Sequence, residues 1–333
     1  MPDTRTTHTV TMKAIVHRRY GGPEVLALEE LPVPVPGADE VLMKVGAVAV
    51  TAADCAIRAA DPFIARLAAG LRRPKRPVLG SEVAGEVVAV GSRVTGVSRG
   101  DRIVGAAGLP MGGYAEYICL PADGVAAIPA GLTDEDVVAV TEGGLTALPF
   151  LRDHATLRGG QTVLINGASG AVGTAAVQLA KHFGAVVTGV CSATNAELVL
   201  SLGADEVIDY ATADFTRARD CYDVVFDAVG KSSFGRCRRT LKPGGVFLTT
   251  VPSPTVLLQM LWTRWLGRRR AVIAFTGLRR PQDKAKDLAL LIELVEAGDI
   301  RPVIDRRLSL AQTAEAHRYV DTGRKRGAVV VSV

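Results

Sequence analysis

The sequence predicts an α/β fold in which a doubly wound parallel sheet is joined to a smaller, barrel-like β domain. Strands and helices alternate from residue 163 onward, short strands with glycine turns crowd the stretch before residue 130, and a glycine-rich turn joins a strand to a helix at 167–173. Alternation favours a parallel sheet with helices on both faces, whereas crowded short strands favour a barrel. A chain of 333 residues is long enough for two such domains.

The N-terminal half contains short apolar or alternating runs bounded by glycine and proline, a pattern that predicts strands. These runs lie at 13–16, 25–30, 41–50, 78–82, 85–91, 94–104 and 112–118. Short helices are predicted at 51–58, 63–71, 133–140 and 145–152, with Thr133 as a cap of the third.

The C-terminal half alternates between apolar runs, which predict buried strands, and segments with apolar residues at helical spacing. The predicted strands lie at 163–166, 186–190, 207–208, 224–226, 246–248 and 271–275. Helices are predicted at 172–184, 195–202 and 283–297, and one more is expected to end at 242–245 in Lys-Pro-Gly-Gly. The chain then closes with a segment at 300–304, a helix at 311–320 and a strand at 328–333.

The turn at 167–173 is the strongest functional signal in the chain. Small residues let a ligand approach the backbone, and the first turn of the following helix offers unpaired N–H groups and a positive dipole end to a pyrophosphate. Its position between an apolar strand and an amphipathic helix favours dinucleotide binding over a purely structural turn. The predicted cofactor-binding residues of this turn are Gly167, Ala168, Ser169, Gly170, Ala171, Val172 and Gly173.

Charge and cysteine content exclude several classes of protein. The net charge of +5 is dispersed except in basic runs at 72–76, 268–270 and 324–326, which lack interleaved aromatic residues, so no nucleic-acid partner is expected. Five scattered cysteines without a C-x-x-C pair are typical of a reduced cytoplasmic protein. Residues 1–11 lack the apolar core of a signal peptide and are interpreted as a disordered tail.

An apolar segment at 256–266 precedes the second basic run. It is too short to span a membrane, so no stable membrane insertion is expected. A lid or core packing is favoured for it, with a dimer contact and an interfacial membrane helix as alternatives.

The sequence resembles the medium-chain dehydrogenase/reductase superfamily, and within it the zinc-independent, quinone oxidoreductase-like (zeta-crystallin-like) branch. The motifs that carry the resemblance are Gly80-Ser81-Glu82, Gly85-Glu86-Val87, Val90-Gly91, 100–104, 113–117, 144–147, the glycine turn, Gly203-Ala204-Asp205 and Lys242-Pro243-Gly244-Gly245. The resemblance implies a GroES-like substrate domain at 12–128, a Rossmann NAD(P)-binding domain at 129–298, and a segment at 299–333 that returns to the first domain. A homodimer is the habit of this family.

The resemblance also predicts that no metal is bound. Zinc-using members place a histidine where this chain has Ser81, and a cysteine near the loop that here contains Thr51 to Asp54. A serine cannot hold zinc as an imidazole does, and Cys55 has no second thiol or histidine beside it. A zinc-type alcohol dehydrogenase is therefore disfavoured.

The cofactor is predicted to be NADPH, with NADH as the alternative. An NAD-specific fold places an acid at the end of the second strand to hold the ribose hydroxyls, whereas 190–195 contains none. Ser192 and Asn195 could donate to a 2′-phosphate, and the resemblance adds Tyr210 at the end of the next strand. A helix cap and a core-edge tyrosine are the structural alternatives for these residues.

Further cofactor contacts follow from the resemblance alone. Thr146, and Thr51 at a position where relatives usually have asparagine, are expected beside the nicotinamide ribose. The nicotinamide end is expected to be lined by Ala228, Val229, Gly230, Phe275 and Gly277.

The predicted reaction is hydride transfer to a quinone or an α,β-unsaturated carbonyl compound. The sequence shows no catalytic triad or fixed acid that would stabilise an alkoxide, whereas an enolate or hydroquinone spreads its charge and can be protonated by water. Tyr114, Asp54 and Arg58 are the catalytic candidates, although structural hydrogen bonding is favoured for each. The alternative is a structural or partner-binding protein that keeps the cofactor site but has little turnover.

Overall fold

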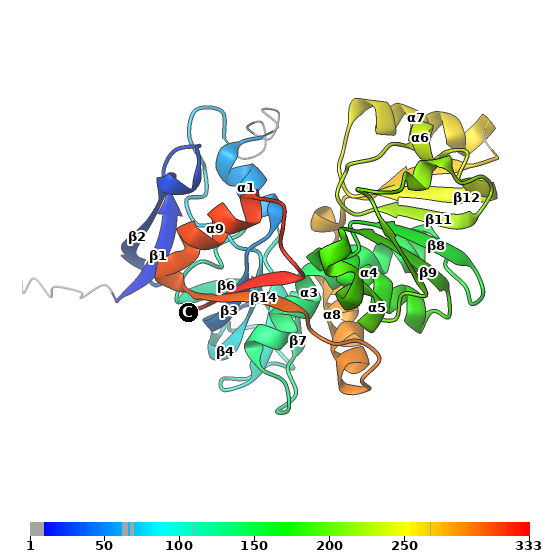
Figure 1. The fold of residues 1–333 in the computed structure, drawn as a ribbon. Helices are drawn as coiled ribbons and strands as arrows, with labels where there is room; N and C mark the ends of the chain where they lie inside the picture. The colour runs from blue at the N-terminus through cyan, green and yellow to red at the C-terminus, as the bar shows by residue number, and fades with distance from the viewer. Residues whose placement is uncertain (1–9, 62–65, 67–69, 109, 267) are drawn as a thin grey trace, which may run out of the picture.

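The computed structural model of the chain describes residues 10–61, 66, 70–108, 110–266 and 268–333. Two lobes lie side by side, the N-terminal strands in one and the long run of alternating strands and helices in the other (Figure 1). Most of the predicted tail at 1–11 and of the predicted helix at 63–71 lies outside the described residues, although the first strand already begins at Thr11.

The second lobe is built on a six-stranded sheet with the order β10-β9-β8-β11-β12-β13. All neighbouring strands in it are parallel, which confirms the predicted doubly wound sheet. Because the strand order reverses between β8 and β11, the carboxyl ends of these strands border the place where open sheets bind ligands. The strands are β8 (Thr162–Asn166), β9 (Val186–Cys191), β10 (Glu206–Asp209), β11 (Tyr222–Asp227), β12 (Leu241–Thr249) and β13 (Arg270–Ile273).

Helices connect these strands and cover the sheet (Figure 1). The apolar stripe of the helix after the glycine turn faces the core, where Ala176, Leu179 and Ala180 are fully buried. The helices of this lobe are α4 (Ala171–His182), α5 (Ala196–Ser201), α6 (Phe234–Cys237), α7 (Pro254–Leu266) and α8 (Pro281–Glu296).

The Lys-Pro-Gly-Gly segment does not end a helix, so that prediction is wrong. The preceding helix, α6, already ends at Cys237, and residues 242–245 lie in the irregular beginning of β12. Gly244 adopts a φ of +86°, and its N–H donates to the Arg268 carbonyl oxygen at 2.6 Å. The segment therefore shifts the register of β12 against β11, a role that glycine supports because it has no Cβ.

The first lobe contains a seven-stranded sheet with the order β14-β15-β3-β4-β5-β7, and β6 also pairs with β3. Because β15 pairs with β3, the C-terminal end of the chain returns to the lobe in which the chain began. The predicted strands at 94–104 and 112–118 shrink to β5 and β6, which begin later. The elements are β1 (Thr11–His17), β2 (Leu26–Pro32), β3 (Glu40–Ala49), α1 (Ala52–Ala59), β4 (Glu82–Val90), β5 (Arg102–Ala106), β6 (Tyr117–Pro121), β7 (Val125–Ala127), β14 (Ile304–Ser309), α9 (Thr313–Asp321) and β15 (Ala328–Ser332).

A single helix, α3 (Asp134–Pro149), replaces the two helices predicted at 133–140 and 145–152. The two glycines that suggested a break lie inside the helix, where they permit close packing. A Cβ on Gly143 would overlap the Ala171 carbonyl oxygen, and one on Gly144 would meet the Leu291 side chain at 2.6 Å. Helix α3 contacts β3, β4 and β15 of the first lobe as well as α4 and α8 of the second. It therefore holds the two lobes together.

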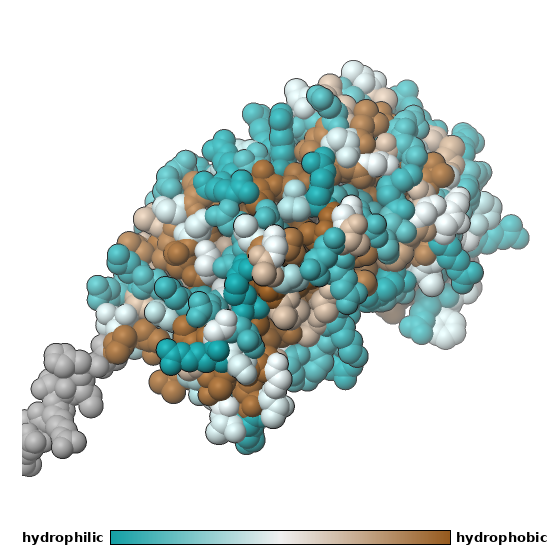
Figure 2. All heavy atoms as spheres, turned by 90° about the horizontal axis from the view of Figure 1, so that it is seen from below, coloured by the Kyte–Doolittle hydropathy of each residue, from teal (hydrophilic) through white to brown (hydrophobic). Residues whose placement is uncertain are grey.

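Among the described residues, no helix is both long enough and apolar enough to span a membrane. Hydrophilic and hydrophobic residues are interspersed on the face shown in Figure 2.

Candidate functional site

The glycine turn lies between β8 and α4, at the end of the sheet where the strand order reverses. Gly167 adopts a φ of +83°, and a Cβ there would collide with Val229. A Cβ on Gly173 would overlap the Gly167 carbonyl oxygen and approach Ala168 Cα to 2.7 Å. These two glycines are therefore required by the fold itself, because helix and turn are in direct contact.

Gly170 differs from the other two glycines of the turn. It precedes α4 with a φ of −79°, which any residue can adopt, and a Cβ there would meet only the Gly167 carbonyl oxygen at 3.7 Å. The fold leaves room for a side chain at this position. A ligand that lies against the turn would fill that room, which fits the predicted cofactor.

The beginning of α4 presents free donors beside Gly170. The first backbone bond of the helix is donated by Thr174 to the Gly170 carbonyl oxygen at 2.8 Å. The loop before β15 reaches this helix end, where Gly170 forms a parallel bridge with Gly327 that engages the Ala171 N–H, whereas in the described part of the chain the N–H groups of Val172 and Gly173 have no hydrogen-bond partner. Unpaired donors at a helix N-terminus suit the pyrophosphate of a dinucleotide, so the residues present fit the group.

Ser169 and Asn195 meet beside the turn. The Asn195 amide Nδ2 donates to Ser169 Oγ at 3.0 Å, while its Oδ1 is buried and has no partner among the described residues. Ser192 Oγ lies 3.0 Å from Thr194 Oγ1, and Tyr210, at the end of β10, is 64% exposed. Strand β10 ends with an acid, Asp209, whose carboxylate accepts the Ala211 N–H at 3.0 Å. One unsatisfied polar atom, Asn195 Oδ1, thus lies where the adenosine end is predicted.

The loop after β11 forms the opposite side of the turn. The buried Asp227 carboxylate accepts the N–H groups of Gly230 at 3.0 Å and Ser232 at 2.8 Å, and the Asn166 amide at 3.0 Å. This clamp fixes Ala228, Val229 and Gly230 at the carboxyl end of the sheet. Three further predicted contacts lie elsewhere: Phe275 and Gly277 are exposed after β13, and Thr146 is partly buried on α3.

Thr51 and Asp54 form a capping box at the start of α1. Thr51 Oγ1 donates to Asp54 Oδ2 at 2.8 Å and accepts the Asp54 N–H at 3.0 Å. Asp54 Oδ1 also accepts the Gly80 N–H at 3.1 Å, and the carboxylate is fully buried. Burial raises the pKa of Asp54, and the hydrogen bonds from Thr51 and Gly80 oppose this shift by lowering it. The Asp54 carboxylate therefore ties α1 to the segment before β4.

Tyr114 and Arg58 are also buried in the first lobe. The Tyr114 hydroxyl lies 3.4 Å from the Ala49 carbonyl oxygen, and burial raises its pKa. The Arg58 guanidinium pairs with Asp321 at 2.8 Å and donates to the Gly21 carbonyl oxygen at 3.2 Å. Its Nη1 lies 3.1 Å from Nδ1 of His317, whose pKa burial lowers to about 3. Hydrogen bonds within the protein thus occupy the polar groups of all three catalytic candidates.

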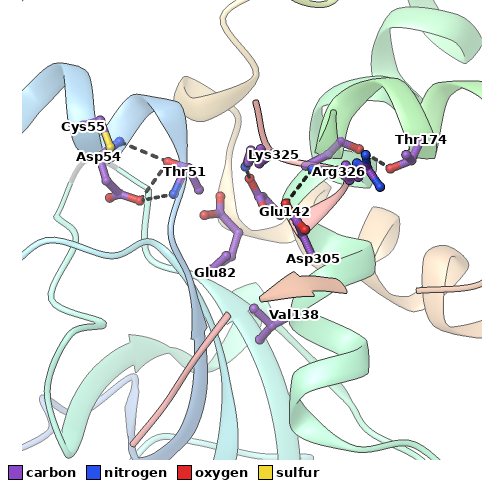
Figure 3. Close-up of polar contacts among 12 residues, drawn as sticks. Thr51, Asp54, Cys55, Glu82, Val138, Glu142, Thr174, Asp305, Lys325 and Arg326 are labelled. Carbon is purple, nitrogen blue, oxygen red and sulfur yellow. Dashed lines mark hydrogen bonds and ion pairs between the residues drawn. The ribbon is translucent and has the colours of Figure 1, made fainter. Parts of the chain in front are cut away.

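Two carboxylates that the sequence did not single out lie near Asp54, on β4 and α3 (Figure 3). Glu82, partly buried at the start of β4, accepts the Ser81 Oγ–H at 2.5 Å. Burial, and then the neighbouring Asp54 and Glu142 carboxylates, raise the pKa of Glu82 to about 7. The motif Gly80-Ser81-Glu82 contained this residue, but only the tertiary contacts show that it is desolvated.

Glu142 lies on α3 and forms a buried ion pair with Lys325 from the loop before β15. Its Oε1 accepts from Lys325 Nζ, whereas its Oε2 is buried and has no partner among the described residues. Burial raises the pKa of Glu142, and Lys325 opposes this shift. A glutamate inside the apolar run 137–145 was the sequence signal that could have drawn attention to this site.

Comparison with known proteins agrees with this architecture. Residues 37–130 match the family described as alcohol dehydrogenase GroES-like domain, and residues 202–331 match the family described as zinc-binding dehydrogenase. The chain is 33% identical to a quinone oxidoreductase of Pseudomonas aeruginosa, over 96% of this chain and 99% of the relative. The chain belongs to the medium-chain dehydrogenase/reductase superfamily, in its quinone oxidoreductase-like branch.

Two further members of this superfamily are informative. The chain is 34% identical to the 2-methylene-furan-3-one reductase of Solanum lycopersicum, over 96% of this chain and 79% of the relative. It superposes with a TM-score of 0.84, at 25% identity, on the crystal structure of Escherichia coli quinone oxidoreductase complexed with NADPH, covering 96% of this chain and all of the other. The protein is therefore an oxidoreductase with an NAD(P)-binding dehydrogenase fold.

The residues that the structure describes contain no group of three or more His, Cys, Asp or Glu side chains that could hold a metal ion. The Ser81 hydroxyl is engaged by Glu82, and the buried Cys55 thiol lies 3.3 Å from His317 Nδ1.

Proposed function

We propose that the protein is an NADPH-dependent, zinc-independent reductase that transfers hydride to a quinone or an α,β-unsaturated carbonyl compound. The observation that carries the proposal is the vacant approach to Gly170 beside the free N–H groups of α4, at the carboxyl end of the parallel sheet. The names of the Pseudomonas, tomato and Escherichia coli relatives support both the substrate class and the cofactor.

The preference for NADPH is supported by the end of β9. No acid follows this strand in 191–195, so nothing there would repel a 2′-phosphate. Ser192, Asn195 and Tyr210 are the residues that we assign to the adenosine end. The exposed Tyr210 ring is available to a nucleotide.

When bound, the nicotinamide supplies the hydride, and the protein provides position and water exclusion. We assign Thr51, Thr146, the loop 228–230, Phe275 and Gly277 to its nicotinamide end. Asp227 holds that loop with hydrogen bonds to Gly230 and Ser232, so it acts as a positioning residue.

The proton that completes the reduction comes from solvent in this proposal. Asp54, Tyr114 and Arg58 are enclosed by hydrogen bonds within the first lobe, and we assign them positioning roles. An enolate or hydroquinone needs little help from a fixed acid because its charge is delocalised. Saturated ketones, which need a stronger electrophile, are expected to be poor substrates.

The experiment is a steady-state assay of NADPH oxidation against a panel of quinones and enones, with deuterium at C4 of the cofactor. The label is expected at the β-carbon of an enone product, with the α-proton taken from water. If the label stays on the cofactor with every substrate while NADPH still binds, the protein is a cofactor-binding member of the superfamily with a structural or partner-binding role. A cytoplasmic location and a homodimer remain predictions.

A further inference from the structure

Helix α7 exposes an apolar stripe that the rest of the protein leaves uncovered. Its residues recur at i, i+3, i+4 and i+7, so they share one face of the helix. Their exposed fractions are 68% for Leu258, 60% for Leu261, 52% for Trp262 and 80% for Trp265. Side chains of this size and exposure on one helix face indicate an interaction surface.

The opposite face attaches α7 to the sheet. Val256 and Thr263 are buried, and Thr263 Oγ1 accepts the Ala271 N–H of β13 at 3.1 Å. The helix is therefore anchored in place with its apolar stripe turned outward. In Figure 1, α7 runs along the outer edge of the second lobe, away from the first lobe.

The chain around α7 is strongly basic. Residues 228–282 contain no aspartate or glutamate and eleven lysines and arginines. Among the described residues, Arg264, Arg268 and Arg270 form no ion pair, and the latter two are exposed. The Arg264 Cζ lies 5.8 Å from the ring centre of Trp265. The eleven basic residues of 228–282 are Lys231, Arg236, Arg238, Arg239, Lys242, Arg264, Arg268, Arg269, Arg270, Arg279 and Arg280.

Several of these cations meet at the C-terminal end of α7. Arg269 pairs with Asp220 and donates to the Leu241 carbonyl oxygen at 2.6 Å, while the Asp220 N–H donates to the Arg239 carbonyl oxygen at 2.9 Å. The turn with Arg238 and Arg239 thus lies beside the run 268–270. The apolar stripe with its two tryptophans is therefore adjoined by Arg264, Arg268 and Arg270, which lie on α7 and in the residues that follow it.

We propose that this surface docks the protein onto an anionic phospholipid bilayer, with α7 lying in the plane of the interface. Tryptophan and leucine side chains with adjacent arginines are the composition of helices that bind there. A 13-residue helix is about 20 Å long, shorter than the ~30 Å hydrocarbon core, so α7 lies on the membrane and does not cross it.

Charge favours a bilayer over a second copy of the chain. Carboxylates outside 228–282 already pair with Arg236, Lys242, Arg269, Arg279 and Arg280. A twofold contact through α7 would bring Arg264, Arg268 and Arg270 of both subunits together, and α7 itself carries no carboxylate that could neutralise them. Anionic headgroups satisfy the arginines and the acyl region receives the apolar stripe. This docking is independent of the proposed reductase activity, and its test uses no substrate.

The protein carries its own probe for the test. Its two tryptophans, Trp262 and Trp265, are both on α7, so intrinsic tryptophan emission reports only on this helix. We expect emission to shift to shorter wavelength with vesicles of mixed phosphatidylcholine and phosphatidylglycerol, and the protein to sediment with them. Vesicles of phosphatidylcholine alone should bind it at least ~tenfold more weakly.

Two pairs of variants separate docking from loss of folding. Leu258→Ser with Leu261→Ser keeps both tryptophans and should weaken sedimentation at least ~tenfold. Val35→Ser removes a side chain that is 86% exposed on the other lobe and should bind like the wild type. Unchanged thermal unfolding midpoints would show that all variants fold.

Charge is tested in the same way. Arg264→Glu with Arg268→Glu should abolish the preference for phosphatidylglycerol, whereas Arg99→Glu, exposed in the first lobe, should keep it. The proposal is overturned if no vesicle binds the protein, or if the α7 variants bind as the controls do. The proposal is also overturned if, without lipid, raising the protein concentration both shifts the tryptophan emission and increases the molecular mass in solution. In that case a second copy of the chain would cover α7.

Discussion

Replacing Glu82 by glutamine should stabilise the protein above neutral pH and leave it nearly unchanged below about pH 5. The reference pKa of a glutamate is 4.5, and burial beside Asp54 and Glu142 raises the pKa of Glu82 to about 7 in the folded protein. The folded state therefore holds the Glu82 proton more tightly than the unfolded state does. Its stabilising contribution is complete below pH 4.5 and is lost as the pH rises through about 7.

The size of the effect follows from the shift. Raising the pKa from 4.5 to about 7, at ~1.4 kcal/mol for each pH unit, sets an upper limit of ~3.5 kcal/mol on the free energy of unfolding that ionisation of Glu82 removes. Glutamine cannot ionise, and its carbonyl can still accept the Ser81 hydroxyl. The variant should therefore match the wild type at low pH and exceed its stability increasingly until about pH 8.

Urea unfolding followed by circular dichroism from about pH 5 to about pH 8.5 measures this difference. Glu86→Gln, an exposed position on the same strand, is the matched control and should show no such trend. The reasoning would be refuted if the difference in free energy of unfolding between Glu82→Gln and the wild type were constant over this pH range. It would also be refuted if the free energy of unfolding of Glu82→Gln fell relative to that of the wild type as the pH rises.

Four further predictions concern the cofactor site, its metal and the buried network. Gly170→Ala should weaken NADPH binding at least ~tenfold in a cofactor titration while changing the free energy of unfolding by less than ~0.5 kcal/mol. Gly173→Ala should lower the free energy of unfolding by about 3 kcal/mol, because its Cβ would overlap the backbone. Equal loss of stability in both variants, measured by denaturation, would contradict this distinction. NADPH should bind more tightly than NADH by fluorescence titration, and Tyr210→Phe should narrow the gap; an unchanged ratio would remove Tyr210 from the phosphate site. Elemental analysis should find no stoichiometric zinc, and a chelator should leave activity unchanged; one zinc per chain would disprove this. Asp54→Asn should destabilise the protein by ~2 kcal/mol because it disrupts acceptors for Thr51 and Gly80, yet lower turnover of the folded enzyme by no more than about a hundredfold; abolished turnover in a folded variant would instead make Asp54 catalytic.

Local sequence patterns determined the parallel sheet and the strand, turn and helix around Gly167 to Gly173. These features depend on periodicity and on glycine within a few adjacent residues, so they are visible before the chain is folded. The same patterns misled at Gly143 and Gly144, where glycine serves contacts with Ala171 and Leu291 and does not break the helix.

Only the tertiary structure brings together the cluster of carboxylates at the junction of the lobes. Asp54, Glu82, Glu142 and Lys325 are far apart in the chain, and their burial and mutual charge exist only after α1, β4, α3 and the loop before β15 are packed together. Sequence shows which residues can ionise, but desolvation, which sets their pKa values, is a property of the packed interior.

Helix α7 shows the same division. The sequence predicted an apolar segment at 256–266, and it did not show which of the segment's residues would meet the core. The fold buries Val256 and Thr263 against β13 and leaves Leu258, Trp262 and Trp265 exposed. The sequence by itself determined that the segment is apolar and too short to span a membrane; only the position of β13 decided which of its faces remains at the surface, because burial is set by the neighbouring elements and not by the helix.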